Sequence, residues 1–122
     1  MILADTSVWI DHFRSNNEQM RKQLEHGQIV IHPLIVAELA LASLRDRTKT
    51  LGYLDLLPQV QVAQIGEVRQ MIEARSLYAR GIGLIDAQLI AAVFLSPPTL
   101  LWTRDMRLRA VAEALGIHAD LP

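Results

Sequence analysis

The sequence predicts an α/β fold in which a parallel sheet is covered by helices on both faces. Short apolar segments such as Ile2–Ala4 alternate along the chain with longer stretches that have helical periodicity. This alternation is typical of parallel sheets, whose crossover helices cover both faces and are right-handed. Hydrophobic residues make up 51% of the 122 residues, enough to form a core at this length. In open sheets of this kind, functional sites form at the carboxyl ends of the strands.

The first third of the chain predicts two strands and three helices. Ile2–Ala4 is an apolar strand that meets a helix cap at Asp5, and a helix over residues 8–13 follows. The helix Glu18–Glu25 is closed by a His-Gly pair, and a strand covers residues 29–31. Pro33 suits the first position of a helix over residues 34–44.

The remaining elements follow from turn residues and periodicity. A helix over residues 49–56 stops before Pro58, and alternating Val and Gln residues predict a strand over 60–65. Glycines at 81 and 83 and the Pro97-Pro98 pair separate the later segments. Those segments are predicted helices over 67–78, 84–94 and 106–115, and predicted strands over 99–102 and 117–118.

Composition limits the class of protein. No repeat or linker divides the chain, so we expect one domain over residues 1–122. The absence of Cys excludes thiolate chemistry, and the longest apolar run, seven residues, is far below the roughly 20 needed to cross a bilayer. Asp5 interrupts the N-terminal apolar run, which does not fit a signal peptide. We therefore expect a soluble cytoplasmic protein without a membrane partner.

Charge gives no global attraction to nucleic acid, because the net charge is −1 and the pI is near 6.4. Ten Arg stand against two Lys, and Arg favours forked contacts with phosphate. The local clusters at residues 45–49 and 104–109 are interpreted on their own as solvated faces.

Four of the thirteen acidic residues lie in apolar surroundings. Asp5 ends an apolar strand, and Asp105 follows another at residues 100–102. Glu38 and Asp86 have mostly apolar residues at helical spacing, which places them on core-facing stripes. Other acids, Asp11 among them, have Arg or Lys neighbours at helical spacing or lie near predicted element ends, and need no functional explanation.

A buried carboxylate is unfavourable unless it is paired, and clustered carboxylates raise one another's pKa. Convergence of these four acids therefore calls for a cation, and a hard ion such as Mg²⁺ or Mn²⁺ suits oxygen ligands. No His lies at metal-ligand spacing with them, which argues against zinc. Taken singly, Asp5, Asp86 and Asp105 could each be helix caps or dipole partners, so the metal site depends on the whole set.

The four acids lie in motifs that resemble those of PIN-domain ribonucleases, specifically the VapC toxins of VapBC toxin–antitoxin systems. The matching stretches are residues 1–10 (MILADTSVWI), 36–39 (VAEL), 83–92 (GLIDAQLIAA) and 101–108 (LWTRDMRL). Each motif is weak alone, but the ordered set runs essentially from end to end. Thr103 stands near the place where some relatives carry a further acid, which leaves open whether one metal or two are bound.

The resemblance implies a three-layer α/β/α PIN-domain fold with about five parallel strands and an endoribonuclease that hydrolyses phosphodiester bonds. It implies four catalytic, metal-binding acids, with hydroxyls of Thr6 or Ser7 and of Thr103 in support. We hypothesise that Asp5 and Asp86 bind Mg²⁺ or Mn²⁺ most directly, while Glu38 and Asp105 orient waters or complete a second site. The four acids are Asp5, Glu38, Asp86 and Asp105.

The same resemblance implies the partners of such an enzyme. They are an RNA substrate, for which transfer or ribosomal RNA loops are plausible, a VapB-like antitoxin that covers the pocket, and a second copy in a homodimer. Three arginines beside the fourth acid, Arg104, Arg107 and Arg109, are candidate phosphate contacts.

Four other classes of protein share parts of this pattern. A haloacid-dehalogenase-type phosphatase requires a second Asp where Ser7 stands, and a response-regulator receiver requires a late Lys, but the last Lys is Lys49. A non-catalytic PIN-like scaffold would be expected to lack one of the acids. A housekeeping metal-dependent nuclease differs only in its biological role, and a neighbouring antitoxin gene would distinguish it.

Overall fold

The computed structural model describes residues 1–122 and contains a parallel sheet with the strand order β2-β1-β3. The central strand β1 (Ile2–Ala4) pairs with β2 (Ile29–Val30) and with β3 (Leu100–Trp102). Ala4 and Trp102 are register partners, so the carboxyl ends of β1 and β3 lie side by side. The predicted α/β class with a parallel sheet is confirmed.

The regular sheet is narrower than the five strands expected. In place of the predicted strand 60–65, Gln59 forms a single parallel bridge with Ile31. The pairing cannot continue because the next donor from that side would be Pro33, which has no backbone N–H and begins the following helix. His118 likewise forms only one bridge, with Leu101. Both predicted outer strands therefore run beside the sheet in parallel, but neither forms a regular ladder.

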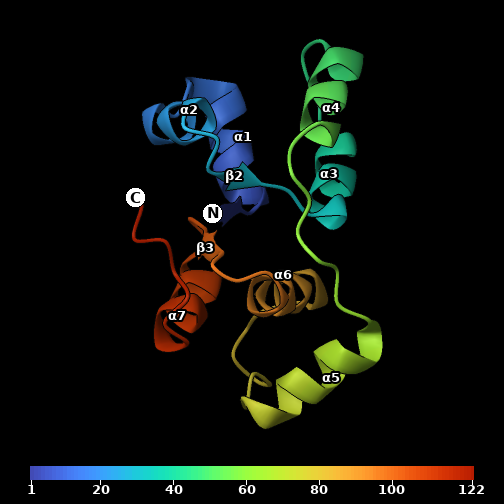
Figure 1. Cartoon of the computed structure of the whole chain (residues 1–122), viewed down its shortest axis with the longest axis vertical. Helices are drawn as coiled ribbons and strands as arrows, with labels where there is room; N and C mark the ends of the chain where they lie inside the picture. Colours follow the sequence, from blue (N-terminus) through green and yellow to red (C-terminus); the bar gives the residue numbers. More distant parts are fainter.

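Seven helices surround the strands, and in Figure 1 the strands lie between α1 and α2 on one side and α6 and α7 on the other. Every predicted helix is present, although several ends differ. The helices are α1 (Thr6–Ser15), α2 (Glu18–Glu25), α3 (Pro33–Ala40), α4 (Arg47–Asp55), α5 (Ile65–Ala74), α6 (Leu84–Leu95) and α7 (Met106–Ala114). None of them has the length and apolar character that a membrane span requires.

Local hydrogen bonds accompany two of the helix ends that differ from the prediction. The helix α3 stops at Ala40 instead of residue 44, and the Arg47 side chain bonds to the free carbonyl oxygen of Ala40. The helix α5 begins at Ile65 instead of residue 67, because the Glu67 carboxylate accepts the Gln64 N–H at 2.9 Å. The spacing of apolar residues in the sequence does not predict such side-chain bonds at helix ends.

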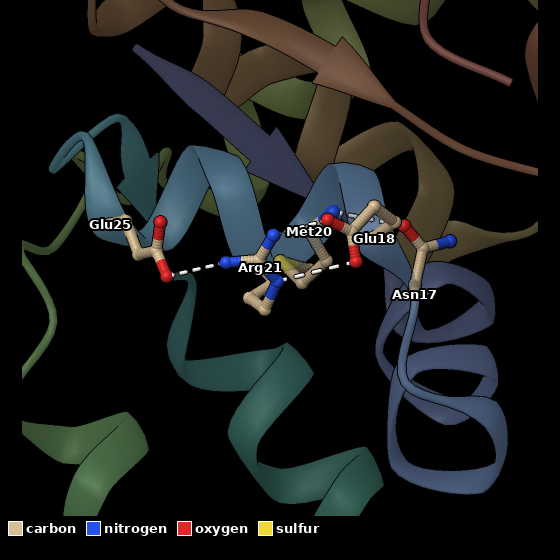
Figure 2. A network of polar contacts seen from close by, with 5 residues as sticks. All are labelled: Asn17, Glu18, Met20, Arg21 and Glu25. Atoms are coloured by element: carbon tan, nitrogen blue, oxygen red, sulfur yellow. Dashed lines mark hydrogen bonds and ion pairs between the residues drawn. The ribbon is translucent and has the colours of Figure 1, made fainter.

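The N-terminus of α2 shows the same kind of capping. The Asn17 side-chain oxygen accepts the Met20 N–H at 2.9 Å, and Arg21 pairs with both Glu18 and Glu25 (Figure 2). These ion pairs are exposed and add little to stability. The 23-residue hydrophobic core, which includes the fully buried Trp102 and the nearly buried Trp9, stabilises the fold instead.

Candidate active site

Two of the four acids come from the paired carboxyl ends of β1 and β3. Asp5 directly follows β1, and its N–H donates to the Trp102 carbonyl at 2.9 Å. Thr103 and Asp105 follow β3, the strand that lies beside β1. The sheet therefore fixes the backbone of Asp5 against the segment that carries the fourth acid, as the carboxyl-end rule predicts.

Asp5 is buried, with 6% of the residue exposed, and both of its carboxylate oxygens accept hydrogen bonds. Oδ1 accepts the Ser7 N–H at 2.8 Å and also the Ser7 hydroxyl, while Oδ2 accepts the Thr103 hydroxyl at 2.6 Å. Asp5 is thus the N-cap of α1. The same carboxylate therefore both caps the helix and belongs to the acid cluster.

Thr103 connects Asp5 to Asp105. The Thr103 side chain is fully buried; its Oγ1 donates to Asp5 and accepts the Asp105 N–H at 3.0 Å. Asp105 in turn caps α7, because its Oδ1 accepts the Leu108 N–H at 3.0 Å. Asp105 is exposed, so it lies beside the buried helix face and not in the apolar surroundings expected of it; as an N-cap it precedes that face.

Glu38 enters the site from α3, which begins where the buried His32 side chain accepts the Leu34 N–H at 3.0 Å. Glu38 Oε1 accepts the Thr6 hydroxyl at 2.7 Å, which joins α3 to the first turn of α1. The sequence left open whether Thr6 or Ser7 supports the acids. In the structure each has its own acid, because Thr6 bonds to Glu38 and Ser7 bonds to Asp5.

Asp86 lies in the first turn of α6, where its Oδ2 accepts the Gly83 N–H at 3.2 Å. Burial raises the pKa of this half-buried carboxyl, and the charges of Asp105, Asp5 and Glu38 raise it further, while the Gly83 N–H acts in the opposite direction. All three other acids therefore act electrostatically on Asp86.

No cation pairs with these acids. The ion pairs of the protein involve other carboxylates, so the mutual repulsion at Asp86 is not offset by a basic side chain. No three acidic or His side chains approach closely enough to form a complete metal shell. The four acids are thus close enough to influence one another's charge, but too far apart for three of their carboxylates to bind one ion directly.

The three arginines near Asp105 have different environments. Arg104 pairs with Asp11 at 2.7 Å, and Arg109 pairs with Glu113 at 2.9 Å. Arg107 forms no ion pair and lies against Gly81: a Cβ at that position would be 2.8 Å from the Arg107 Cδ. Gly81 has a φ of +78°, a conformation that also favours glycine.

Asp11 is the residue that sequence reasoning missed. The sequence pattern puts it near the end of a predicted helix, whereas it lies inside α1, one turn after Ser7. The available signal was this four-residue spacing, which places Ser7 and Asp11 on one face of the helix. What the sequence could not reveal is that Arg104 approaches that face.

This fold and acid cluster define the class of the protein. The chain belongs to the PIN-domain family, whose model matches residues 2–114. The similarity extends to Ribonuclease VapC32 of Mycobacterium tuberculosis, in strains CDC 1551 / Oshkosh and ATCC 25618 / H37Rv. Each is 40% identical to this chain over 117 residues, which covers 96% of this chain and 94% of the relative.

Proposed function

We propose that this protein is a divalent-metal-dependent endoribonuclease and the toxin of a type II toxin–antitoxin pair, acting in the cytoplasm as one domain of residues 1–122. One observation carries the proposal. Hydrogen bonds through Thr103 join Asp5 to Asp105. The charges of these two acids and of Glu38 act on Asp86, and no basic side chain neutralises them. The similarity to a ribonuclease over nearly the whole chain supports the same activity.

The side chains fit Mg²⁺ or Mn²⁺. The donors are carboxylate and hydroxyl oxygens, which hard cations prefer. Because no three of the acids lie close enough to coordinate one ion together, an ion bound here would take one or two carboxylates and keep several waters. When bound, such an ion neutralises phosphate charge and lowers the pKa of water. Burial and then the charges of the other three acids raise the pKa of Asp86, so a cation bound beside it would favour its charged form.

The residues divide the work in the following way. Asp5 and Asp86 bind the ion directly. Asp5 is held in orientation by the hydroxyls of Ser7 and Thr103. Asp86 has only one long hydrogen bond, from the Gly83 N–H, so its charge most needs a cation. Glu38 and Asp105 orient water for attack on phosphorus or complete a second ion site. Thr6, Ser7 and Thr103 fix the orientation of the carboxylates through their hydroxyls.

The substrate is an RNA phosphodiester, and cleavage leaves 5′-phosphate and 3′-hydroxyl ends. Among the three arginines near Asp105, Arg107 is the phosphate contact that the geometry favours, because Arg104 and Arg109 are engaged in ion pairs. Affinity for RNA then rests on few cations and falls as salt rises. Exposed loops of transfer or ribosomal RNA are the expected targets.

A VapB-like antitoxin and a second copy of the chain are the expected protein partners. Large apolar side chains remain exposed around α3 and α4, where Leu41 and Leu56 are 90% and 85% exposed. Exposed apolar surface of this kind is typical of protein interfaces. Co-expression with any small gene found immediately upstream, followed by size measurement of the free and bound protein, tests both partners.

The deciding experiment incubates the purified protein with total cellular RNA in Mg²⁺, in Mn²⁺ and in EDTA. We expect discrete fragments only with metal, and a loss of at least about 10³-fold for Asp5→Asn, equivalent to about 4 kcal/mol. Asn preserves the helix cap, so the variant should remain folded by circular dichroism. Metal-independent cleavage, or an active Asp5→Asn variant, would overturn the assignment; absence of both cleavage and metal binding would favour a non-catalytic scaffold.

A further inference from the structure

Arg104 makes two contacts with α1 from a position between Thr103 and Asp105. Its backbone N–H donates to the Ser7 hydroxyl oxygen at 3.0 Å, and its guanidinium pairs with Asp11 at 2.7 Å. The Ser7 hydroxyl in turn donates to Asp5. The turn that carries the fourth acid is thus attached to the helix that the first acid caps, through both its backbone and its side chain.

Asp11 is itself held in place. The Asn17 side-chain nitrogen donates to Asp11 Oδ2 at 2.8 Å, while the Asn17 oxygen caps α2. Figure 2 shows this division, with the Asn17 oxygen toward Met20 and the nitrogen directed away from it. The hydrogen bond from Asn17, followed by the charge and hydrogen bond of Arg104, lowers the pKa of Asp11, so Asp11 is ionised at neutral pH. The Asp11 carboxylate is therefore a charged acceptor that is already oriented toward the Arg104 guanidinium.

We infer that the Asp11–Arg104 ion pair is a positioning clamp that sets Asp105 and Thr103 relative to Asp5, and that Arg104 is not an RNA contact. Asp11 and Arg104 are positioning residues, because they act through Ser7, Thr103 and Asp105. The expected effect on catalysis rests on the proposed nuclease function, whereas the positioning of Thr103 and Asp105 can be measured without RNA.

Magnitudes distinguish this role from simple stabilisation. The two side chains are 47% and 31% exposed, and exposed ion pairs contribute little to the stability of a fold. Catalysis is far more sensitive to position, because a displacement of about 1 Å at a reacting group can reduce a rate by about 10²-fold. A positioning clamp should therefore affect turnover while the melting temperature changes little.

The test compares Asp11→Asn, Arg104→Gln and the double variant with Glu25→Gln. Asn at position 11 still accepts the hydrogen bond from Asn17 but loses its charge. Glu25→Gln is the control, because it breaks an exposed pair with Arg21 (2.6 Å) on α2 (Figure 2). We expect each single variant to lower kcat on RNA about 10-fold with KM unchanged, the double variant to be no worse than either single variant, and the control to match the wild type.

Amide hydrogen exchange supplies a readout that needs no RNA. The Arg104 and Asp105 N–H groups donate to the Ser7 and Thr103 side chains, so loss of the clamp should speed their exchange severalfold in Asp11→Asn but not in Glu25→Gln. Mn²⁺ titration should show weaker binding in the same variant.

Two results would overturn the clamp. Unchanged exchange at Arg104 and Asp105 in Asp11→Asn would refute it, whether or not the wild type cleaves RNA. An Asp11→Asn variant with tighter RNA binding and undiminished kcat would show instead that Asp11 restrains an arginine that binds phosphate. Failure of the wild type to cleave RNA, with exchange altered as expected, would refute the proposed function and leave the clamp standing.

Discussion

The candidate site consists of two halves that differ in how their carboxylates are held. The strand half comprises Asp5, Ser7, Thr103 and Asp105, in which hydroxyl and backbone donors join one acid to the other. The helix half comprises Thr6, Glu38 and Asp86, in which Glu38 has one hydroxyl partner and Asp86 has one backbone partner at 3.2 Å.

The difference shows where a cation would act most. In the strand half, donors from the protein already stabilise and orient the charges without an ion. In the helix half, burial and neighbouring acids oppose the charge of Asp86, so this half gains most from a bound cation. The strand half is therefore pre-organised, and the helix half is expected to be ordered by the metal.

The largest effect we expect in this comparison is stabilisation by metal. At Mn²⁺ near 100 times its Kd, mass action adds about 2.7 kcal/mol to the free energy of unfolding, which raises Tm by roughly 10 °C for a chain of this size. Thermal melts in EDTA and in Mn²⁺ measure this shift. Asp86→Asn should remove most of it, and an equal shift in that variant would place the ion elsewhere.

Thr103→Val tests the pre-organised half. It removes the hydroxyl that donates to Asp5 and accepts from Asp105, inside a fully buried position. We expect cleavage to fall about 10- to 100-fold and the free energy of unfolding to fall by about 1–3 kcal/mol. Kinetics and denaturant unfolding measure the two effects. Thr103→Ser keeps the hydroxyl and should restore most of the activity; failure to do so would attribute the loss to packing.

Thr6→Val is the matching change in the helix half. It removes the only hydroxyl that bonds to Glu38, but the metal can orient Glu38 in its place. We therefore expect only a severalfold loss of cleavage, at the low end of the range for outer-shell partners, with recovery as Mn²⁺ is raised. A loss as large as that of Thr103→Val, unaffected by Mn²⁺, would contradict the distinction between the halves.

The same two halves separate what sequence could predict from what it could not. Asp5 and Asp105 were located by apolar strands, and parallel strands bring their carboxyl ends to one edge, so their proximity followed from the pattern. Glu38 and Asp86 were identified from helical spacing, but spacing does not give the distance between two helices. The width of the cluster therefore required coordinates.

Residues whose roles depend on a distant partner were the hardest to assign. Asp11 looked unremarkable because its partner Arg104 is 93 positions away in the chain. The predicted strands at 60–65 and 117–118 failed for a related reason: Val-rich alternation indicates an extended segment, whereas a ladder needs a neighbour in register. Local patterns thus predicted the elements, and long-range pairing determined their extent.

The smallest expected effect concerns pH and the metal-free protein. Because burial raises the pKa of Asp86 in the folded state, the folded protein binds this proton more tightly than the unfolded chain does. The resulting stabilisation is complete below the ordinary pKa of 3.8 and is lost as pH rises through the raised folded value. At pH 7 the charged carboxylate therefore lowers the stability of the metal-free protein.

Asp86→Asn removes this charge and keeps an acceptor for the Gly83 N–H. In EDTA at pH 7 we expect its Tm to exceed that of the wild type by a few degrees, with the difference vanishing near pH 3. Thermal melts across this pH range measure the difference. A wild type that is the more stable protein at pH 7 would mean that Asp86 is already neutralised without metal, and the helix half would then be as pre-organised as the strand half.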